Sequence, residues 1–244
     1  MPDRDRPDVV GFALTYESGT FIYPHTHPAH QIIHAISGTM RVSVGGELWF
    51  LPIGFALWIP EGMEHAIRCG GRVRMRTAYL SAAYPAIFPD VRMISVTPLM
   101  REVLVRLAEG GGGALDRPLS DLLLNEIRMG SMDPFRLPIP DDPRIATLAS
   151  HLQDEPSVDR TLGEWAKRLG FSERSLIRAI RAETGMTFRD LRRHSRIMAG
   201  IEKLSEGRSV TAIAFEVGFE TPSAFIHAFR SVTGKTPRKF VGTS

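Results

Sequence analysis

The sequence has only one cysteine, Cys69, and no long run of apolar residues. A single cysteine excludes an internal disulfide framework and fits a reducing compartment. No stretch approaches the roughly 20 apolar residues that a membrane-spanning helix needs. The first residues, MPDRDRPDVV, lack the apolar centre of a signal peptide. These absences predict a cytoplasmic protein that has no membrane partner.

Net charge is also low, at +3 over 244 residues, but it is unevenly spread. Residues 160–244 hold 16 Lys and Arg against 8 Asp and Glu, whereas the remaining residues hold 14 against 19. A basic block joined to an acidic one indicates that one part of the chain meets a polyanion. A basic surface that is merely solvated is the alternative, and charge alone does not decide between the two.

Short apolar and β-branched runs fill residues from about 10 to 97, and turn signals such as Ser37-Gly38 separate them. Many short strands at this spacing predict an antiparallel sandwich or barrel. After residue 97 the apolar residues recur at helical spacing, which predicts helices over residues 98–109 and 118–130. These helices either pair with a second subunit, as in a homodimer, or pack within their own subunit.

The segment Met132–Pro143 contains four prolines and cannot lie inside a helix or a sheet. We therefore expect a β domain over residues 1–97, a helical segment over 98–131, a proline-rich linker over 132–143 and an all-α domain over 144–244. The predicted fold class is α+β, in more than one domain.

The clearest signal is an internal repeat within residues 161–236. In its first part the two copies match at an offset of 48 residues, where Leu162, Ala166, Leu169, Gly170 and Phe171 correspond to Val210, Ala214, Val217, Gly218 and Phe219. After one inserted residue the offset becomes 49, and both copies then end in Thr-Gly-x-Thr. A solenoid normally needs at least three copies, so two copies favour a pair of similar units.

Each copy predicts two helices joined by a tight turn. Gly170 and Gly218 lie where the first helices end, because glycine readily adopts the left-handed conformation of a C-terminal cap. Ser172 and Thr221 can cap the second helices. This arrangement is typical of a helix-turn-helix unit, with an ordinary helical hairpin as the alternative. We predict helix-turn-helix units over residues 161–183 and 209–232, joined by a linker helix over residues 187–205.

Residues 144–241 resemble the DNA-binding domain of AraC/XylS-type transcriptional regulators, including the two Gly-Phe turns and the segment GFETPSAFIHAFRSVTGKTPRKF. The resemblance implies that the partner is double-stranded DNA at a promoter or operator, and also RNA polymerase if the protein is an activator. The outward positions of the recognition helices then correspond to Arg174, Ser175, Arg178, Ser223, Ala224 and His227. The first and third of these are suited to guanine edges or, alternatively, to phosphates. Three arginines of the linker helix are suited to neutralise phosphates, namely Arg192, Arg193 and Arg196.

Three histidines crowd the stretch YPHTHPAHQ, and a fourth, His65, follows PEGME. On a strand, residues 25, 27 and 31 point to the same face. These two segments resemble the paired motifs of cupin barrels, in which such positions surround a divalent metal. This chain departs from the cupin pattern at two positions, since Gln31 replaces the usual glutamate and Cys69 the usual asparagine.

The cupin resemblance implies a metal site made of His25, His27, Gln31 and His65. Neutral imidazoles suit Zn, Ni, Fe or Cu, and the loss of the glutamate removes an anionic ligand, so we expect weaker or more selective binding. The alternative is a polar effector pocket that the same histidines line. His30 and Cys69 are further candidates for that pocket.

Together these features predict a sequence-specific, one-component transcription regulator that is not an enzyme. Its N-terminal cupin-like domain is expected to be a sensor for a small molecule or a metal. A cupin enzyme, such as a metal-dependent oxygenase or isomerase with a helical appendage, would explain the histidines but not the repeat. A regulator whose sensor binds no ligand is the third reading.

Overall fold

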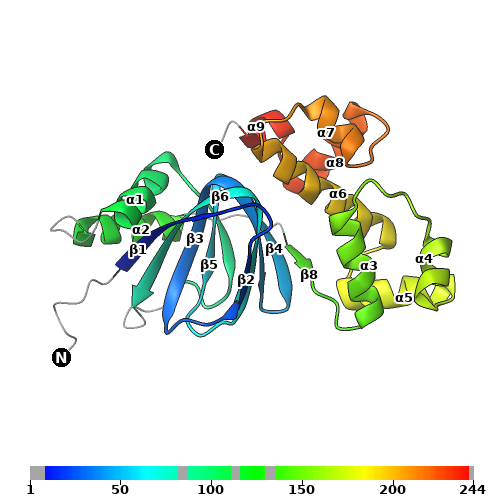
Figure 1. The fold of residues 1–244 in the computed structure, drawn as a ribbon, viewed down its shortest axis with the longest axis horizontal. Helices are drawn as coiled ribbons and strands as arrows, with labels where there is room; N and C mark the ends of the chain where they lie inside the picture. The colour runs from blue at the N-terminus through cyan, green and yellow to red at the C-terminus, as the bar shows by residue number, and fades with distance from the viewer. Residues whose placement is uncertain (1–8, 82–86, 111–115, 130–135, 242–244) are drawn as a thin grey trace. The chain divides into compact units, whose positions relative to one another are not determined.

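The computed structural model describes residues 9–81, 87–110, 116–129 and 136–241. Its first part is a strongly curved, barrel-like β-sheet, coloured from blue to green in Figure 1. The strands are β1 (Val9–Tyr16), β2 (Phe21–His25), β3 (Ala29–Val44), β4 (Glu47–Leu51), β5 (Phe55–Ile59), β6 (His65–Ser81) and β7 (Arg92–Ser95). The long strand β6 pairs with β3 along one edge, and with β1 and β2 in turn along the other. β1 and β2 therefore lie along the same edge of β6, each beside a different end of that strand.

β3 is one strand, although the Ser37-Gly38 pair predicts a break between two. Gly38 has a φ of +74°, and a Cβ at this position would lie 2.7 Å from the carbonyl oxygen of Arg72. The register between β3 and β6 shifts on both sides of Ser37. The glycine therefore produces a bulge that bends the strand while its pairing continues, instead of a turn that ends it.

Two helices cover one face of this sheet, α1 (Pro98–Glu109) and α2 (Asp116–Met129). Thr97 caps α1 by accepting a hydrogen bond from the Met100 amide. The apolar stripes of both helices are buried against the sheet in one cluster, which includes Val103, Leu107 and Ile127. The structure thus shows packing within the chain for the two helices of the predicted segment 98–131, and their pairing with a second subunit stays a prediction.

The remaining elements are helical apart from a short strand. They are β8 (Arg136–Pro138), α3 (Pro143–Asp154), α4 (Leu162–Leu169), α5 (Glu173–Thr184), α6 (Phe188–Ser205), α7 (Val210–Glu216), α8 (Pro222–Thr233) and α9 (Pro237–Val241). The chain divides into two units: the first runs to Phe135, and the second comprises Arg136–Thr243 together with Gly46–Leu48. The predicted fold class is confirmed: an antiparallel cupin-like β domain with two helices precedes an all-α domain with two helix-turn-helix units.

Local chemistry explains why the helices of the repeat begin and end where they do. Thr161 and Glu164 form a capping box at the start of α4, and Gly170 ends that helix with a φ of +71°. Ser172 and Thr221 cap α5 and α8, as the sequence predicts. Among the described residues, none of the helices has the length and apolar content that a bilayer crossing would need.

The central helix α6 holds the second unit together. It contacts α3, α5, α7, α8 and α9, and its buried residues include Ile197 and Ile201. Gly200 lies among them because a Cβ there would be 2.8 Å from the buried Phe225 ring of α8. Both repeat copies are therefore packed on one rigid element, which sets how the two second helices are presented.

Candidate functional site

The second helices of the two repeat units, α5 and α8, each bury one face and expose the other. Leu176 and Ile180 of α5, like Phe225 and Phe229 of α8, are fully buried. Five of the six residues predicted for DNA contact on these helices are exposed, namely Arg174, Arg178, Ser223, Ala224 and His227. The sixth, Ser175, is half-buried, and its hydroxyl accepts a hydrogen bond from the Ser172 hydroxyl.

Two large apolar residues of the outward faces were not among the residues predicted to contact DNA. Ile177 is 51% exposed on α5, and Ile226 is 37% exposed on α8. They occupy the same position in the two repeat copies, at the offset of 49 residues. The repeat alignment could have identified them, because an apolar residue repeated next to an exposed Arg178 or His227 is not part of the buried stripe.

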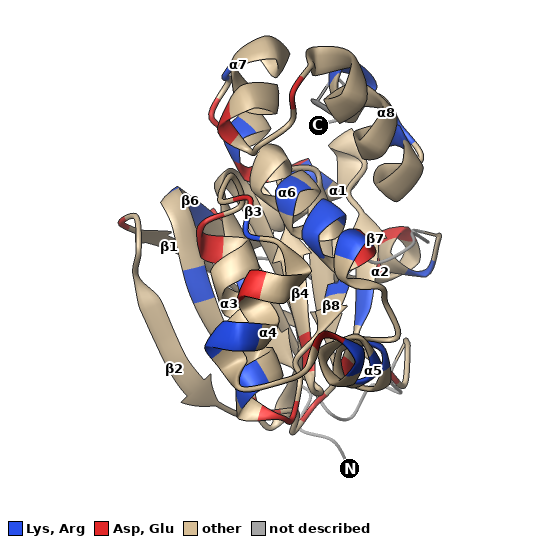
Figure 2. Ribbon diagram, turned by 90° about the vertical axis from the view of Figure 1, so that its right-hand side faces the viewer, with Lys and Arg blue, Asp and Glu red and all other residues tan. Residues whose placement is uncertain are grey.

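The three arginines predicted to contact phosphates from α6 are engaged within the protein. The guanidinium of Arg192 lies 2.6 Å from an Asp159 carboxylate oxygen, and that of Arg193 lies 2.7 Å from Asp190. Arg196 also pairs with Asp159, its side chain is 13% exposed, and burial lowers its pKa. Figure 2 shows Lys and Arg along α4, α5 and α6. Their contacts with DNA stay predictions, and for Arg196 the burial favours a structural role.

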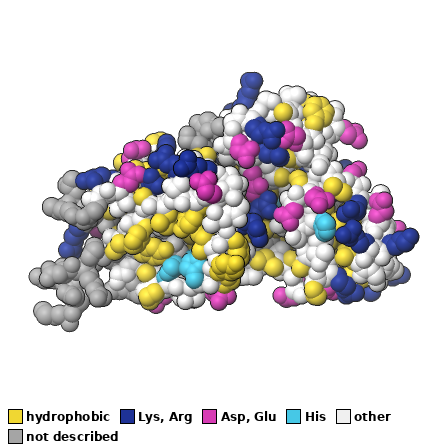
Figure 3. All heavy atoms as spheres, in the orientation of Figure 1, with side chains coloured by type: hydrophobic (Ala, Val, Ile, Leu, Met, Phe, Trp, Pro, Cys, Tyr) yellow, Lys and Arg dark blue, Asp and Glu magenta, His cyan; other side chains and the backbone are white. Residues whose placement is uncertain are grey.

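Three of the predicted metal ligands lie together at one end of the β-sheet. The candidate ligand atoms of His25, His27 and His65 are all within 4.8 Å of one another, and the first and last of these residues are direct partners in β2 and β6. Figure 3 shows histidine side chains, in cyan, among hydrophobic ones, in yellow, on this part of the surface. We call these three residues the histidine cluster.

Hydrogen bonds determine which nitrogen each imidazole presents. Nδ1 of His25 lies 2.7 Å from the Tyr23 carbonyl oxygen, and Nδ1 of His65 lies 3.0 Å from the Met63 carbonyl oxygen. A carbonyl oxygen only accepts, so each Nδ1 carries a proton, and in the neutral imidazole the Nε2 then has a lone pair. The Nε2 of His65 is buried and has no hydrogen-bond partner among the described residues. Such backbone contacts are typical of histidines that bind a metal through Nε2.

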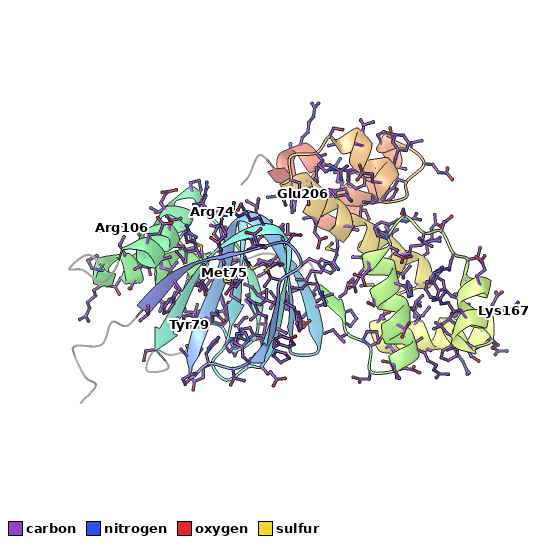
Figure 4. All side chains as sticks on the ribbon, viewed as in Figure 1. Arg74, Met75, Tyr79, Arg106, Lys167 and Glu206 are labelled. Atoms are coloured by element: carbon purple, nitrogen blue, oxygen red, sulfur yellow. The ribbon has the colours of Figure 1, made fainter. Side chains whose placement is uncertain are left out.

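The fourth predicted ligand, Gln31, approaches the histidine cluster through Tyr79. Gln31 Nε2 donates to the hydroxyl oxygens of Thr77, at 3.1 Å, and Tyr79, at 2.9 Å. The Tyr79 hydroxyl lies 3.4 Å from Nε2 of His27. Figure 4 labels Tyr79 and Met75 along β6. Tyr79 was not predicted, because the 52 residues that separate it from His27 conceal their contact.

Desolvation favours the neutral forms of two histidines of the cluster and of Tyr79. Burial lowers the pKa of His27 and of His65, and the neighbouring His25 lowers both further. Burial also raises the pKa of the Tyr79 hydroxyl, so the phenol stays protonated at neutral pH and can donate. Neutral imidazoles are the form that a transition metal binds.

The two further candidates for an effector pocket lie outside the histidine cluster. The ring of His30 stacks on Trp58, and its Nδ1 accepts a hydrogen bond from the Glu61 amide at 3.0 Å. The thiol of Cys69 is buried, and burial raises its pKa. A role for either residue in binding an effector stays a prediction.

The residues present fit a metal ion. Two metal–nitrogen bonds of about 2.0–2.1 Å span about 4 Å at most, and the cluster nitrogens lie within 4.8 Å of one another. Small rotations of the rings would therefore close the set on one ion. The histidine cluster would supply three nitrogens, and the Gln31 Oε1 atom, which has no hydrogen-bond partner among the described residues, is a candidate fourth donor.

Both the β-sheet unit and the helical unit match known protein families. A helix-turn-helix domain family matches residues 165–242, and a cupin domain family matches residues 12–80. The HTH-type transcriptional regulator NimR of Escherichia coli is 27% identical over 245 residues, which cover 98% of this chain and 90% of NimR. The HTH-type transcriptional regulator RipA of Corynebacterium glutamicum is 32% identical over 103 residues, 42% of this chain and 31% of RipA.

Among solved structures, ToxT from Vibrio cholerae is 12% identical, with 98% of each chain covered and a TM-score of 0.42. The C-terminal domain of AraT, a response regulator from Geobacillus stearothermophilus, is 28% identical and covers 42% of this chain and 87% of its own, with a TM-score of 0.40. The curated relatives that match are transcription regulators, so a cupin enzyme is set aside. The chain thus combines a cupin domain with an AraC-type helix-turn-helix domain, the arrangement expected of a transcriptional regulator of that type.

Proposed function

We propose that this regulator is a one-component sensor: α5 and α8 read a specific DNA sequence, and a divalent metal or small molecule in the cupin domain controls that binding. The observation that supports sequence reading is the matched pair of outward faces. Both helices expose residues at equivalent repeat positions, Arg174 with Ser223 and Arg178 with His227. Two similar faces that differ in their polar side chains are suited to read two different half-sites.

The length of α6 supports binding of both helix-turn-helix units to one face of DNA. The connecting helix α6 has 18 residues, which corresponds to about 27 Å. One turn of B-form DNA separates successive major-groove faces by about 34 Å. A rigid helix of this length is suited to hold the two recognition helices close to one helical turn apart.

The exposed faces offer two kinds of contact to base edges. Arg174 and Arg178 are exposed, and the structure describes no ion pair for either, so their guanidinium groups are available for guanine O6 and N7. Ile177 and Ile226 are available for the methyl group of thymine, which is the apolar feature of the major groove. We therefore expect operators in which G and T positions carry most of the specificity.

Binding-site selection tests the reading of DNA. Random duplexes selected on the protein should yield one preferred sequence, and Arg174→Ala should weaken binding to it by about 1–3 kcal/mol while relaxing the preference at one base pair. Arg72→Ala is the matched control, because it removes an exposed arginine from the β-sheet unit. Failure to select any sequence, or an equal loss on all duplexes, would contradict sequence-specific reading by α5.

Elemental analysis tests the sensor. After reloading with Zn, Ni, Fe or Cu, the protein should retain about one divalent ion per chain, and His25→Ala should abolish this retention. His151→Ala is the control, because it removes a histidine from the DNA-binding unit. Absence of stoichiometric metal in the unaltered protein would contradict the metal sensor. The remaining alternatives would be an effector that binds without a metal, or a cupin domain that binds no ligand.

A further inference from the structure

Gln31 presents a buried oxygen that nothing in the described protein satisfies. The residue is 3% exposed, and its Oε1 has no hydrogen-bond partner among the described residues. Its Nε2 donates to the Thr77 hydroxyl, whose own proton goes to the Ile32 carbonyl oxygen, so turning the amide round would sacrifice that hydrogen bond. A buried acceptor without a partner destabilises the fold. A ligand that supplies a cation or a donor at this point would remove that penalty.

The donor set of the histidine cluster carries no negative charge. Within the described residues, the group that could hold an ion contains three histidines and no Asp, Glu or Cys. Gln31 adds only a neutral amide. A divalent ion that neutral groups hold keeps its full charge, and its open coordination position then favours an anion over a neutral ligand.

β1 places an exposed apolar strip beside the histidine cluster. The strip consists of Val10, Phe12 and Leu14, which are 37–46% exposed. Val10 lies opposite Tyr79 in the pairing of β1 with β6, and directly paired residues share a face of the sheet. The Phe12 ring meets the Tyr79 ring at 5.7 Å between centroids, and the Tyr79 ring lies 4.8 Å from that of His27. The strip is therefore one aromatic ring away from the cluster.

We infer that the effector is a small organic anion with an apolar, ring-sized body, whose charged group binds the ion at the histidine cluster while its body covers the strip. This inference rests on the proposed metal-dependent sensor. Two observations together indicate this class of effector. A metal site whose ligands carry no charge favours an anion, and three exposed apolar side chains favour a ligand with a hydrophobic body. A sugar or other polyol would leave its hydroxyl groups facing Val10, Phe12 and Leu14, which offer no hydrogen bonds.

Cobalt(II) in place of the native ion makes anion binding visible, because its absorption spectrum changes when a ligand enters the coordination sphere. The cobalt-loaded full-length protein is titrated with benzoate, with acetate and with benzyl alcohol. Benzoate should change the spectrum at concentrations about tenfold or more below those that acetate requires, because ring burial adds to its affinity. Benzyl alcohol, which has the ring but no charge, should leave the spectrum unchanged.

Two variants test the contributions of the strip and of the ion site separately. Phe12→Ser should retain cobalt and reduce the advantage of benzoate over acetate severalfold, and a thermal melt checks its folding. Gln31→Glu should bind cobalt more tightly and benzoate more weakly, because the new carboxylate offsets the charge of the ion.

The outcomes distinguish a failure of this inference from a failure of the proposed metal-dependent sensor on which it rests. If cobalt binds but benzoate has no advantage over acetate, or if benzyl alcohol competes equally, the effector class is wrong and the metal sensor stands. If cobalt does not bind the unaltered protein, the metal sensor itself is wrong, and the inference fails with it.

Discussion

Arg196 in α6 donates a hydrogen bond from Nε to the carbonyl oxygen of Pro156, 3.0 Å away in the loop between α3 and α4. The same guanidinium pairs with Asp159 in that loop and lies over the Phe219 ring, 5.8 Å from its centroid. A Cβ on Gly218 would lie 3.0 Å from it. One side chain thus joins the start of the first helix-turn-helix unit to the turn of the second.

Replacing Arg196 with methionine should destabilise the DNA-binding unit by about 1–3 kcal/mol, because buried hydrogen bonds to backbone and carboxylate are lost. Urea unfolding followed by circular dichroism measures the free energy of unfolding. Arg193→Met is the control, since its side chain is 38% exposed and pairs with a neighbour on the same helix, and it should cost less than about 1 kcal/mol. Equal losses in the two variants would show that Arg196 contributes only as a surface charge.

Gly200→Ala should destabilise the protein, although alanine favours a helix by about 1 kcal/mol over glycine. The new Cβ would lie 2.8 Å from Cε2 of Phe225, whose ring is fully buried and cannot retreat. Overpacking of this kind costs about 1–3 kcal/mol, so the net loss should reach about 1 kcal/mol in urea unfolding. Because Phe225 belongs to α8, affinity for the selected operator should fall as well.

Gly163→Ala is the matched control for this effect. Its Cβ would meet only the Glu173 carboxylate, at the end of a flexible side chain that can move away. The helix propensity of alanine should then dominate, and α4 should gain up to about 1 kcal/mol. A loss at Gly163 equal to that at Gly200 would contradict the packing argument.

Features that depend on neighbouring residues in sequence could be predicted. The caps Thr161, Ser172 and Thr221 and the left-handed Gly170 follow from side chains that act within one helical turn. The strand period, by contrast, does not explain why His25 and His27 lie together, because β2 ends at His25 and His27 lies outside a strand. Local rules were enough for the helix caps because each partner lies within a few positions along the chain.

Features that depend on strand register could not be predicted from pattern alone. Tyr79 meets His27 only because β6 pairs with β1, β2 and β3, and no local signal in the sequence determines that register. The bulge at Gly38 looks like a turn until its partner strand is known. Arg196 looks like any other arginine of a basic helix, and its burial becomes evident only when α6 is packed against Pro156 and Asp159.

His34 should make the β-sheet unit less stable as the pH falls below neutral. Its Nδ1 lies 2.8 Å from the Phe55 carbonyl oxygen, and burial, with smaller contributions from Arg101 and Arg76, lowers its pKa from 6.5 to about 4. Between these two values the unfolded chain binds a proton that the folded chain does not. The free energy of unfolding should therefore decrease by up to about 1.4 kcal/mol for each pH unit between 6.5 and 4.

The variant His34→Gln isolates this effect, because glutamine can still donate to the Phe55 carbonyl but does not titrate. Urea unfolding of both proteins between pH 7 and pH 5 should show a steeper loss of stability in the protein that carries His34. Other histidines with lowered pKa values, such as His194, act equally in both proteins and cancel. Parallel profiles would mean that the imidazole of His34 becomes protonated without unfolding.

Ile177 should read a thymine methyl group in the selected operator, and uracil offers a test because it lacks only that methyl. Replacing the contacted thymine with uracil should weaken binding of the unaltered protein by about 1 kcal/mol, the contribution of one buried methyl group. Ile177→Ala should bind thymine and uracil duplexes equally, because the side chain that meets the methyl is gone. Arg174→Ala should bind more weakly but keep the full preference for thymine. Fluorescence anisotropy with the six combinations of the three proteins and the two duplexes measures the coupling. A thymine preference that survives unchanged in Ile177→Ala would assign the methyl contact to another residue.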